Sequence, residues 1–115
     1  MAATKLNAVS PIIAIEAVTI GVSAESLVTA GATIPSNTGE IWGYVPASDN
    51  IHWLPNGTPT TTVGHAVTAN KWFMLTHAQH GSLIVSDDGA DINLLVAYMR
   101  GAGSALSNAS NAVPN

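Results

Sequence analysis

The chain has 115 residues and a mass of 11.7 kDa, with three basic residues, seven acidic residues and no cysteine. This length allows one domain, the lack of cysteine excludes disulfides, and a net charge of −4 without any cluster of Lys or Arg excludes a nucleic-acid contact surface. Charged residues make up only 9% of the sequence, whereas a soluble domain usually carries about 25%. Because Ala, Thr, Ser, Asn and Gly stand in their place, we expect other subunits to cover much of the surface.

The N-terminal run MAATKLNAVSPIIAIEAVTIGV, residues 1–22, has one lysine followed by apolar residues and faintly resembles a signal peptide. Pro11 and Glu16 interrupt its apolar part, which is also too short to span a bilayer. We therefore expect mature protein at this end of the chain and no membrane partner.

Short runs rich in β-branched and aromatic residues fill the middle of the chain and are separated by turn signals. In chain order, the candidate strands are 12–22, 25–34, 39–47, 50–55, 60–67, 70–76, 81–87 and 91–100. Turn signals at intervals of about 8–12 residues are typical of a sandwich or barrel, and no segment keeps a helical apolar stripe over three turns. We predict an all-β fold, a single β-sandwich of jelly-roll type, because eight strands suit that architecture.

The two ends of the chain differ in composition from this middle part. Residues 1–11 are mostly small and polar, and residues 101–115 form a low-complexity segment of small residues. We expect a sandwich domain over residues 12–100 with extended arms at both ends that are held by neighbouring subunits; the alternative is that each arm folds back on its own sandwich. The apolar residues that could anchor the arms are Leu6, Val9, Leu106 and Val113.

The histidines give weak metal signals. His77 and His80 are three residues apart, which places two ligands on one side only if the segment is helical. The segment follows a strand and precedes Gly81, so a connecting loop is favoured over a zinc site. His52 and His65 are interpreted as half-exposed strand residues.

The segment SDDGAD places three carboxylates, those of Asp87, Asp88 and Asp91, within five residues, which could hold calcium. The distal glutamate of the EF-hand pattern is missing, and Asp88 followed by Gly89 between two apolar runs favours a tight turn. The chain has no cysteine and no G-x-S-x-G motif for nucleophilic catalysis. We expect no catalytic residues, no metal site and no cofactor.

The aromatic residues point to contact surfaces. Trp42 and Tyr44 share one strand face and would project together, as in lectin-like modules that stack on sugar rings. Trp53 and Trp72 lie among Ile, Leu and Met, where a role in the core or between subunits is the default. Trp72 and Met74 in NKWFMLT are candidate interface residues, and we expect self-association into a dimer or trimer.

The stretch DNIHWLPNGTPTTTVGH, residues 49–65, is interpreted as a strand, a Pro-Asn-Gly turn, an extended Thr-Pro-Thr segment and a glycine, Gly64, where backbone must pass closely. The later run GSLIVSDDGADINLLVAYMR is interpreted as a closing strand pair with an acidic turn. Together these motifs, within residues 39–100, resemble those of small β-rich virion proteins of tailed bacteriophages, of the head decoration or cement type.

This resemblance implies a structural protein on the exterior of the capsid, made in the host cytoplasm. It implies binding to the major capsid protein and stabilisation of contacts between its subunits. The alternatives are another virion component, such as a neck, tail or fibre-base protein, or a carbohydrate-binding module that uses Trp42 and Tyr44.

Overall fold

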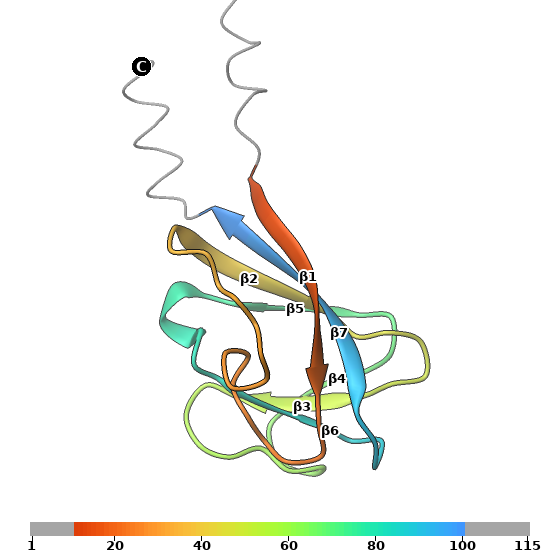
Figure 1. Ribbon diagram of the computed structural model, residues 1–115. Helices are drawn as coiled ribbons and strands as arrows, with labels where there is room; N and C mark the ends of the chain where they lie inside the picture. Colours follow the sequence, from red (N-terminus) through yellow and green to blue (C-terminus); the bar gives the residue numbers. More distant parts are fainter. Residues whose placement is uncertain (1–10, 101–115) are drawn as a thin grey trace, which may run out of the picture.

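The computed structural model describes residues 11–100, which form strands joined by turns and one short 3-10 helix (Figure 1). In chain order the elements are β1 Ile12–Ile20, β2 Thr38–Tyr44, β3 Ile51–Leu54, β4 His65–Val67, β5 Trp72–Leu75, η1 His77–Gln79, β6 Leu83–Ser86 and β7 Ile92–Arg100. Apart from Pro11, the predicted arms lie outside the described residues, and so do their proposed anchors, Leu6, Val9, Leu106 and Val113. Within this part of the chain, no helix is long and apolar enough to cross a membrane.

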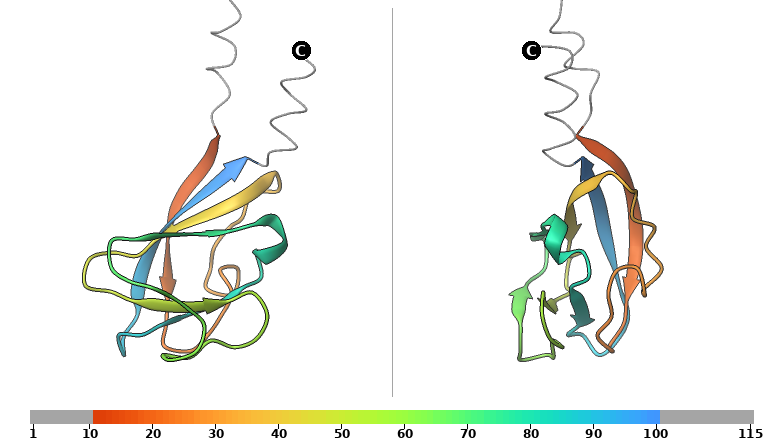
Figure 2. Two further views of the ribbon diagram at one scale, coloured as in Figure 1. Left: turned by 180° about the vertical axis from the view of Figure 1, so that it is seen from behind. Right: turned by 90° about the vertical axis from the view of Figure 1, so that its left-hand side faces the viewer.

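Two antiparallel sheets face each other. The larger sheet has the strand order β1-β7-β2-β5 and the smaller sheet the order β4-β3-β6. In the right-hand view of Figure 2, the orange β1 and blue β7 lie on one side of the molecule and the yellow-green β3 and β4 lie on the other. The predicted all-β sandwich is confirmed.

The strand order is that of a jelly roll in which one strand is almost lost. A complete jelly roll has eight strands, and its second strand crosses to the other sheet and pairs beside the penultimate strand. Residues 21–25 lie in this place beside β6, where the amide of Ser86 donates to the carbonyl of Gly21 at 2.9 Å, and within 25–34 only Glu25 pairs, through an isolated bridge with Ile84. The prediction of a full strand over residues 25–34 is therefore wrong.

Local turn chemistry explains why this segment does not extend. The side-chain oxygen of Ser26 accepts a hydrogen bond from the amide of Thr29 at 3.2 Å, and the carbonyl of Ser26 accepts one from the amide of Ala30 at 2.9 Å. Gly31 follows with φ at 105°, a conformation that glycine adopts at little cost. These local bonds satisfy backbone groups that a strand would offer to its neighbours.

The core lies between the two sheets and takes alternate residues from most strands. Its buried apolar members are Val18, Ile20, Leu27, Ala32, Ile41, Val45, Ile51, Trp53, Val67, Phe73, Leu75, Ile84, Ile92, Leu94, Val96 and Tyr98. Trp53 of the smaller sheet stacks on Phe73 of the larger sheet, with ring centroids 6.0 Å apart. Because full burial of one large apolar side chain contributes roughly 1.5–3 kcal/mol, this core is the main source of the fold's stability.

The stretch over residues 49–65 connects two strands of the smaller sheet, as the sequence predicts. The expected strand over 60–67 is limited to the three residues of β4, because hydrogen bonds of Thr60 close a turn just before it. Gly64 has φ at 122°, and a Cβ atom there would lie 2.9 Å from the carbonyl oxygen of Trp53. The close approach of backbone predicted at this glycine is confirmed.

Candidate functional site

The outer face of the four-stranded sheet, on the side away from the core, is almost entirely apolar. Residues that pair across neighbouring strands share one face of the sheet. The register gives one central row of Ile15, Ala97, Trp42 and Met74, a second central row of Ala17, Leu95, Tyr44 and Trp72, and an adjoining pair of Ile12 and Met99. These ten residues are called the outer face below, and polar residues border it, since Glu40 pairs with Met99 on one side and Thr19 pairs with Asn93 on the other.

The sequence of β7 explains why the sheet is apolar on both sides. Its inward residues Leu94 and Val96 are buried in the core, and its outward residues Leu95, Ala97 and Met99 are apolar as well. An antiparallel strand with one face in water usually alternates apolar with polar residues. Because β7 does not alternate over these positions, its outer side is chemically suited to contact with another apolar surface.

A β-bulge in β1 brings two isoleucines onto the outer face. Ile12 and Ile15 are three residues apart, a spacing that places side chains on opposite faces of a regular strand. The register shifts between Ile12 and Ala14, and the extra residue of the bulge returns Ile12 to the side of Ile15. Ile12 is 42% exposed, so the bulge adds apolar surface that water reaches.

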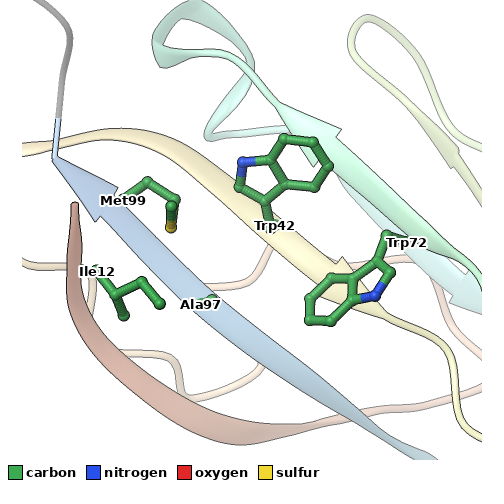
Figure 3. A pocket seen from close by; sticks show the side chains of 5 residues that line it. All are labelled: Ile12, Trp42, Trp72, Ala97 and Met99. Carbon is green, nitrogen blue, oxygen red and sulfur yellow. The ribbon is translucent and has the colours of Figure 1, made fainter. Parts of the chain in front are cut away.

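A shallow groove of about 310 Å³ lies on the outer face (Figure 3). Trp42 and Trp72 form one side, Ile12 and Met99 form the other, and Ala97 lies between them. Pockets that enclose small ligands have volumes of about 300–1,000 Å³. The groove is at the lower limit of that range and open on one side, so it suits protruding side chains of a protein partner better than an enclosed ligand.

Two of the three aromatic side chains on the outer face, those of Trp42 and Tyr44, have their polar atoms satisfied within the molecule. The indole nitrogen of Trp42 donates to a carboxylate oxygen of Glu40 at 3.1 Å, and the hydroxyl of Tyr44 donates to the side-chain oxygen of Asn70 at 2.9 Å. The rings of Tyr44 and Trp72 lie 5.0 Å apart and are tilted by 55°. The outer face therefore offers mainly hydrocarbon, and these two rings do not form one flat platform.

The size of the outer face indicates how much its burial could contribute. Its ten positions, each about 4.8 Å across the strands and about 6.8 Å along them, cover about 330 Å². A contiguous apolar patch of a few hundred Å² on a soluble protein commonly marks an interaction site. At about 25 cal/mol per Å², covering it yields on the order of 10 kcal/mol before the costs of association. Neither central row contains Asp, Glu, Lys, Arg or His.

The structure brings two separate groups of predicted site residues together. Trp72 and Met74, expected at an interface between subunits, share the outer face with Trp42 and Tyr44, expected to contact a glycan. Trp72 is 49% exposed. Trp53 is buried in the core instead. The interface and glycan hypotheses therefore concern one surface, and both remain predictions.

Sequence reasoning missed six of the ten residues of the outer face. The missed residues are Ile12, Ile15, Ala17, Leu95, Ala97 and Met99. The available signal was the lack of alternation in the runs IIAI and LLVAYM, at residues 12–15 and 94–99. Apolar residues on both faces of an antiparallel strand indicate cover on both faces.

His52 and Asp87 form a close contact on the smaller sheet. Nδ1 of His52 lies 2.6 Å from Oδ2 of Asp87, and each side chain is 13% exposed. The amide of Asp87 also donates to the carbonyl of Asn50 at 3.0 Å. These bonds tie the turn after β6 to the start of β3, so they stabilise a strand connection.

His77 and His80 lie next to each other, with ring centroids 5.1 Å apart, at the 3-10 helix η1. The segment connects β5 and β6, as expected for a connecting loop, but it forms a 3-10 helical turn that Thr76 and Gln79 close with a capping box. Nε2 of His80 forms a hydrogen bond with the carbonyl of Gly39 at 3.0 Å. Within residues 11–100, no three His, Cys, Asp or Glu side chains are grouped so that they could hold a metal ion.

The acidic segment SDDGAD forms the connection between β6 and β7, and Gly89 has φ at 71°. The chain bends here, but the predicted closing strand pair is wrong, because β6 pairs with β3 in the smaller sheet and β7 pairs with β1 and β2 in the larger sheet. Desolvation raises the pKa of Asp49, and a hydrogen bond with Asp88 and the charge of Asp88 raise it further. This pair of carboxylates lies beside the contact between His52 and Asp87, and not on the outer face.

Comparisons with protein-family models, curated proteins and solved structures found no match for this chain. The class defined by the fold and the site is an all-β sandwich that leaves the apolar outer face of its larger sheet open to solvent.

Proposed function

We propose that this protein is a structural component of a tailed-bacteriophage virion, a decoration protein on the capsid exterior that stabilises contacts between major capsid subunits. The observation that supports this proposal most is the apolar outer face. A sheet with apolar side chains on both faces reaches its most stable state when a second protein surface covers the open face. A protein whose purpose is to join subunits requires such a surface.

The charge distribution supports the same proposal. Charged residues are 9% of the sequence, and the two central rows of the outer face contain none. A surface of this composition is better suited to permanent contact with protein than to long exposure to water. The net charge of −4 also suits a location outside the shell, away from packaged nucleic acid.

The positions of the chain ends support a lacing role for the predicted arms. The amide of Arg100 donates to the carbonyl of Pro11 at 2.6 Å, so the described chain starts and ends at one place. Ile12 pairs with Met99 there, at the border of the outer face (Figure 1). The segments before Pro11 and after Arg100 therefore join the sandwich beside its apolar surface.

Such a protein stabilises a shell through the summed contributions of many copies. Each copy contributes a modest interface to the seam between neighbouring capsomers. Because many copies act on one closed shell, their small contributions sum to a large resistance to opening, as in other multivalent assemblies.

Quantitative mass spectrometry of virions from cells that carry the gene tests the proposal. The expected result is a copy number comparable to that of the major capsid protein. A far smaller number would instead assign the chain to the neck, tail or fibre base, and its absence from purified particles would overturn a virion role. Stripping the protein from the particles should lower the temperature at which the shells open.

A further inference from the structure

We propose that the outer face of the four-stranded sheet packs against the same face of a second copy of this chain. Trp42 of each copy then fills the groove of the other copy beside Ala97, and Trp72 lies over Ala17 of the other copy. This dimer is a property of the free protein, so it does not require that the virion assignment be correct. It shares with that assignment only the claim that the outer face is an interface.

The shape of the outer face is self-complementary. The half formed by β2 and β5 carries the bulky rings of Trp42 and Trp72, whereas the half formed by β7 and β1 has Ala97 and Ala17 in its two central rows. Figure 3 shows the two indoles on one side of the groove and the aliphatic side chains on the other. Ile15 and Leu95 of this second half also protrude, at 56% and 42% exposed, so the match is between positions: the two indoles of one copy face the two alanines of another.

One symmetry operation brings these halves together. A two-fold axis that lies between the two faces and runs parallel to the strands places β2 and β5 of one copy over β7 and β1 of the other. Homodimers with a two-fold axis are the commonest oligomers, and such an axis uses the same patch twice. Face-to-face packing of sheets about 10 Å apart, with strands about 30° from parallel, is a standard arrangement.

The chemistry of the face favours a second copy over a charged partner. The two central rows contain no ionisable group except the phenol of Tyr44, so two copies approach there without repulsion although each carries a net charge of −4. Trp42 and Tyr44 already donate to Glu40 and Asn70, so covering the rings leaves neither donor unsatisfied. A nucleic acid or a strongly acidic or basic peptide finds no complementary charge in these rows.

The area of the face limits the strength of the dimer. Two faces of about 330 Å² bury about 650 Å² of apolar surface, whereas specific interfaces bury about 1,200–2,000 Å² in total. The remaining area must come from the rim of the sheet. We therefore expect a reversible dimer with a Kd in the micromolar range, on the order of −8 kcal/mol of binding free energy.

Analytical ultracentrifugation of the full chain between about 1 and 200 μM tests this inference, because that range brackets a micromolar Kd. Wild type should shift from monomer to dimer. Leu95→Ser, on the outer face, should raise the Kd at least tenfold, whereas Val63→Ser should leave it unchanged. Val63 is the matched control because it is 50% exposed, similar to Leu95 at 42%, but lies in the loop before β4. Circular dichroism should give the same β spectrum for all three proteins.

Cross-linking tests the direction of the two-fold axis. The axis maps Ile15 at one edge of a central row onto Met74 at the other edge, and the natural chain has no cysteine. A short thiol-specific cross-linker should therefore join an Ile15→Cys chain to a Met74→Cys chain in a mixture. Each variant alone should cross-link far less, because its two thiols would lie at opposite edges of the dimer.

Three outcomes would overturn the inference. They are a monomer at every concentration, a Leu95→Ser protein that dimerises as tightly as wild type, and efficient cross-linking of Ile15→Cys alone. Any of these would leave the virion proposal in place, since that proposal depends on the content of particles. Conversely, the protein could dimerise, with both variants behaving as expected, and yet be absent from virions. That result would support this inference and refute the virion role.

Discussion

Trp42 of β2 pairs with Ala97 of β7 across the outer face, so the largest type of side chain stands beside one of the smallest. This contrast produces the groove, because the indole rises where the methyl group leaves space. In the proposed dimer the same two residues meet again, with Trp42 of one copy above Ala97 of the other.

Replacing Ala97 by leucine should weaken self-association and leave the fold intact. The side chain of Ala97 opens into the groove and not into the core, so a longer side chain fills the space that the second copy needs. We expect the dimer Kd to rise at least tenfold, about 1.4 kcal/mol, with little change in Tm. Ala66→Leu, at an exposed position of β4, is the control and should change neither quantity. A dimer of undiminished affinity in Ala97→Leu would show that the groove is not the contact.

Replacing Tyr98 by phenylalanine should destabilise the domain. The hydroxyl of Tyr98, a residue only 1% exposed, donates to the carboxylate of Glu16, which also accepts the amide of Thr33 at 2.9 Å. Loss of a hydrogen bond to a charged group costs about 1.5–3 kcal/mol, so thermal melting should begin about 10 °C lower. Tyr44→Phe removes a hydroxyl whose bond to Asn70 is exposed and should lower Tm much less. Equal losses in the two variants would contradict the role assigned to Glu16.

The same buried tyrosine predicts a loss of stability in alkaline solution. Desolvation, followed by the hydrogen bond to Glu16 and its charge, raises the pKa of Tyr98 above the ordinary tyrosine value of about 10. Above that pH the unfolded chain loses the phenolic proton while the folded chain keeps it. The unfolded state then binds fewer protons, so the free energy of unfolding falls as pH rises. Wild type should lose stability more steeply than Tyr98→Phe between about pH 9 and 11, and parallel pH profiles would refute this explanation.

Replacing Gly64 by alanine should test the strand connection over residues 49–65. The new Cβ would lie 2.9 Å from the carbonyl oxygen of Trp53, at a φ of 122° that L-residues rarely adopt. We expect a loss of about 1–3 kcal/mol in the free energy of unfolding, measured by urea denaturation. At Gly81 an added Cβ meets nothing within 4 Å, so Gly81→Ala should change stability by less than about 0.5 kcal/mol.

The fold class could be predicted from the sequence because short apolar runs bounded by turns are a local signal. The error over residues 25–34 arose because the serine at 26 and the glycine at 31 act locally, through a turn that competes with strand pairing. Gly64 was identified correctly for a related reason, since a glycine between a turn and a strand predicts a close backbone approach without knowledge of the partner strand.

The outer face could be predicted only in part. Trp42 and Tyr44 share a face because they are two residues apart in one strand, which the sequence alone indicates. The meeting of Ile15 with Ala97 depends on the pairing of β1 with β7, the first and last strands of the domain. Neither this pairing nor the bulge that turns Ile12 outward has a local signal in the sequence.

Oxidation of methionine tests the central claim, that the outer face is a protein interface. Met74 and Met99 both lie on that face, and a thioether in contact with peroxide is converted to the sulfoxide. Wild-type protein should be treated with dilute peroxide over a series of protein concentrations, and both residues quantified by mass spectrometry, with Leu95→Ser as the reference. Both methionines should become protected as wild-type concentration rises and stay reactive in Leu95→Ser. Oxidation of Met74 and Met99 at one rate at every wild-type concentration, and equally fast in purified particles, would contradict an interface on the outer face.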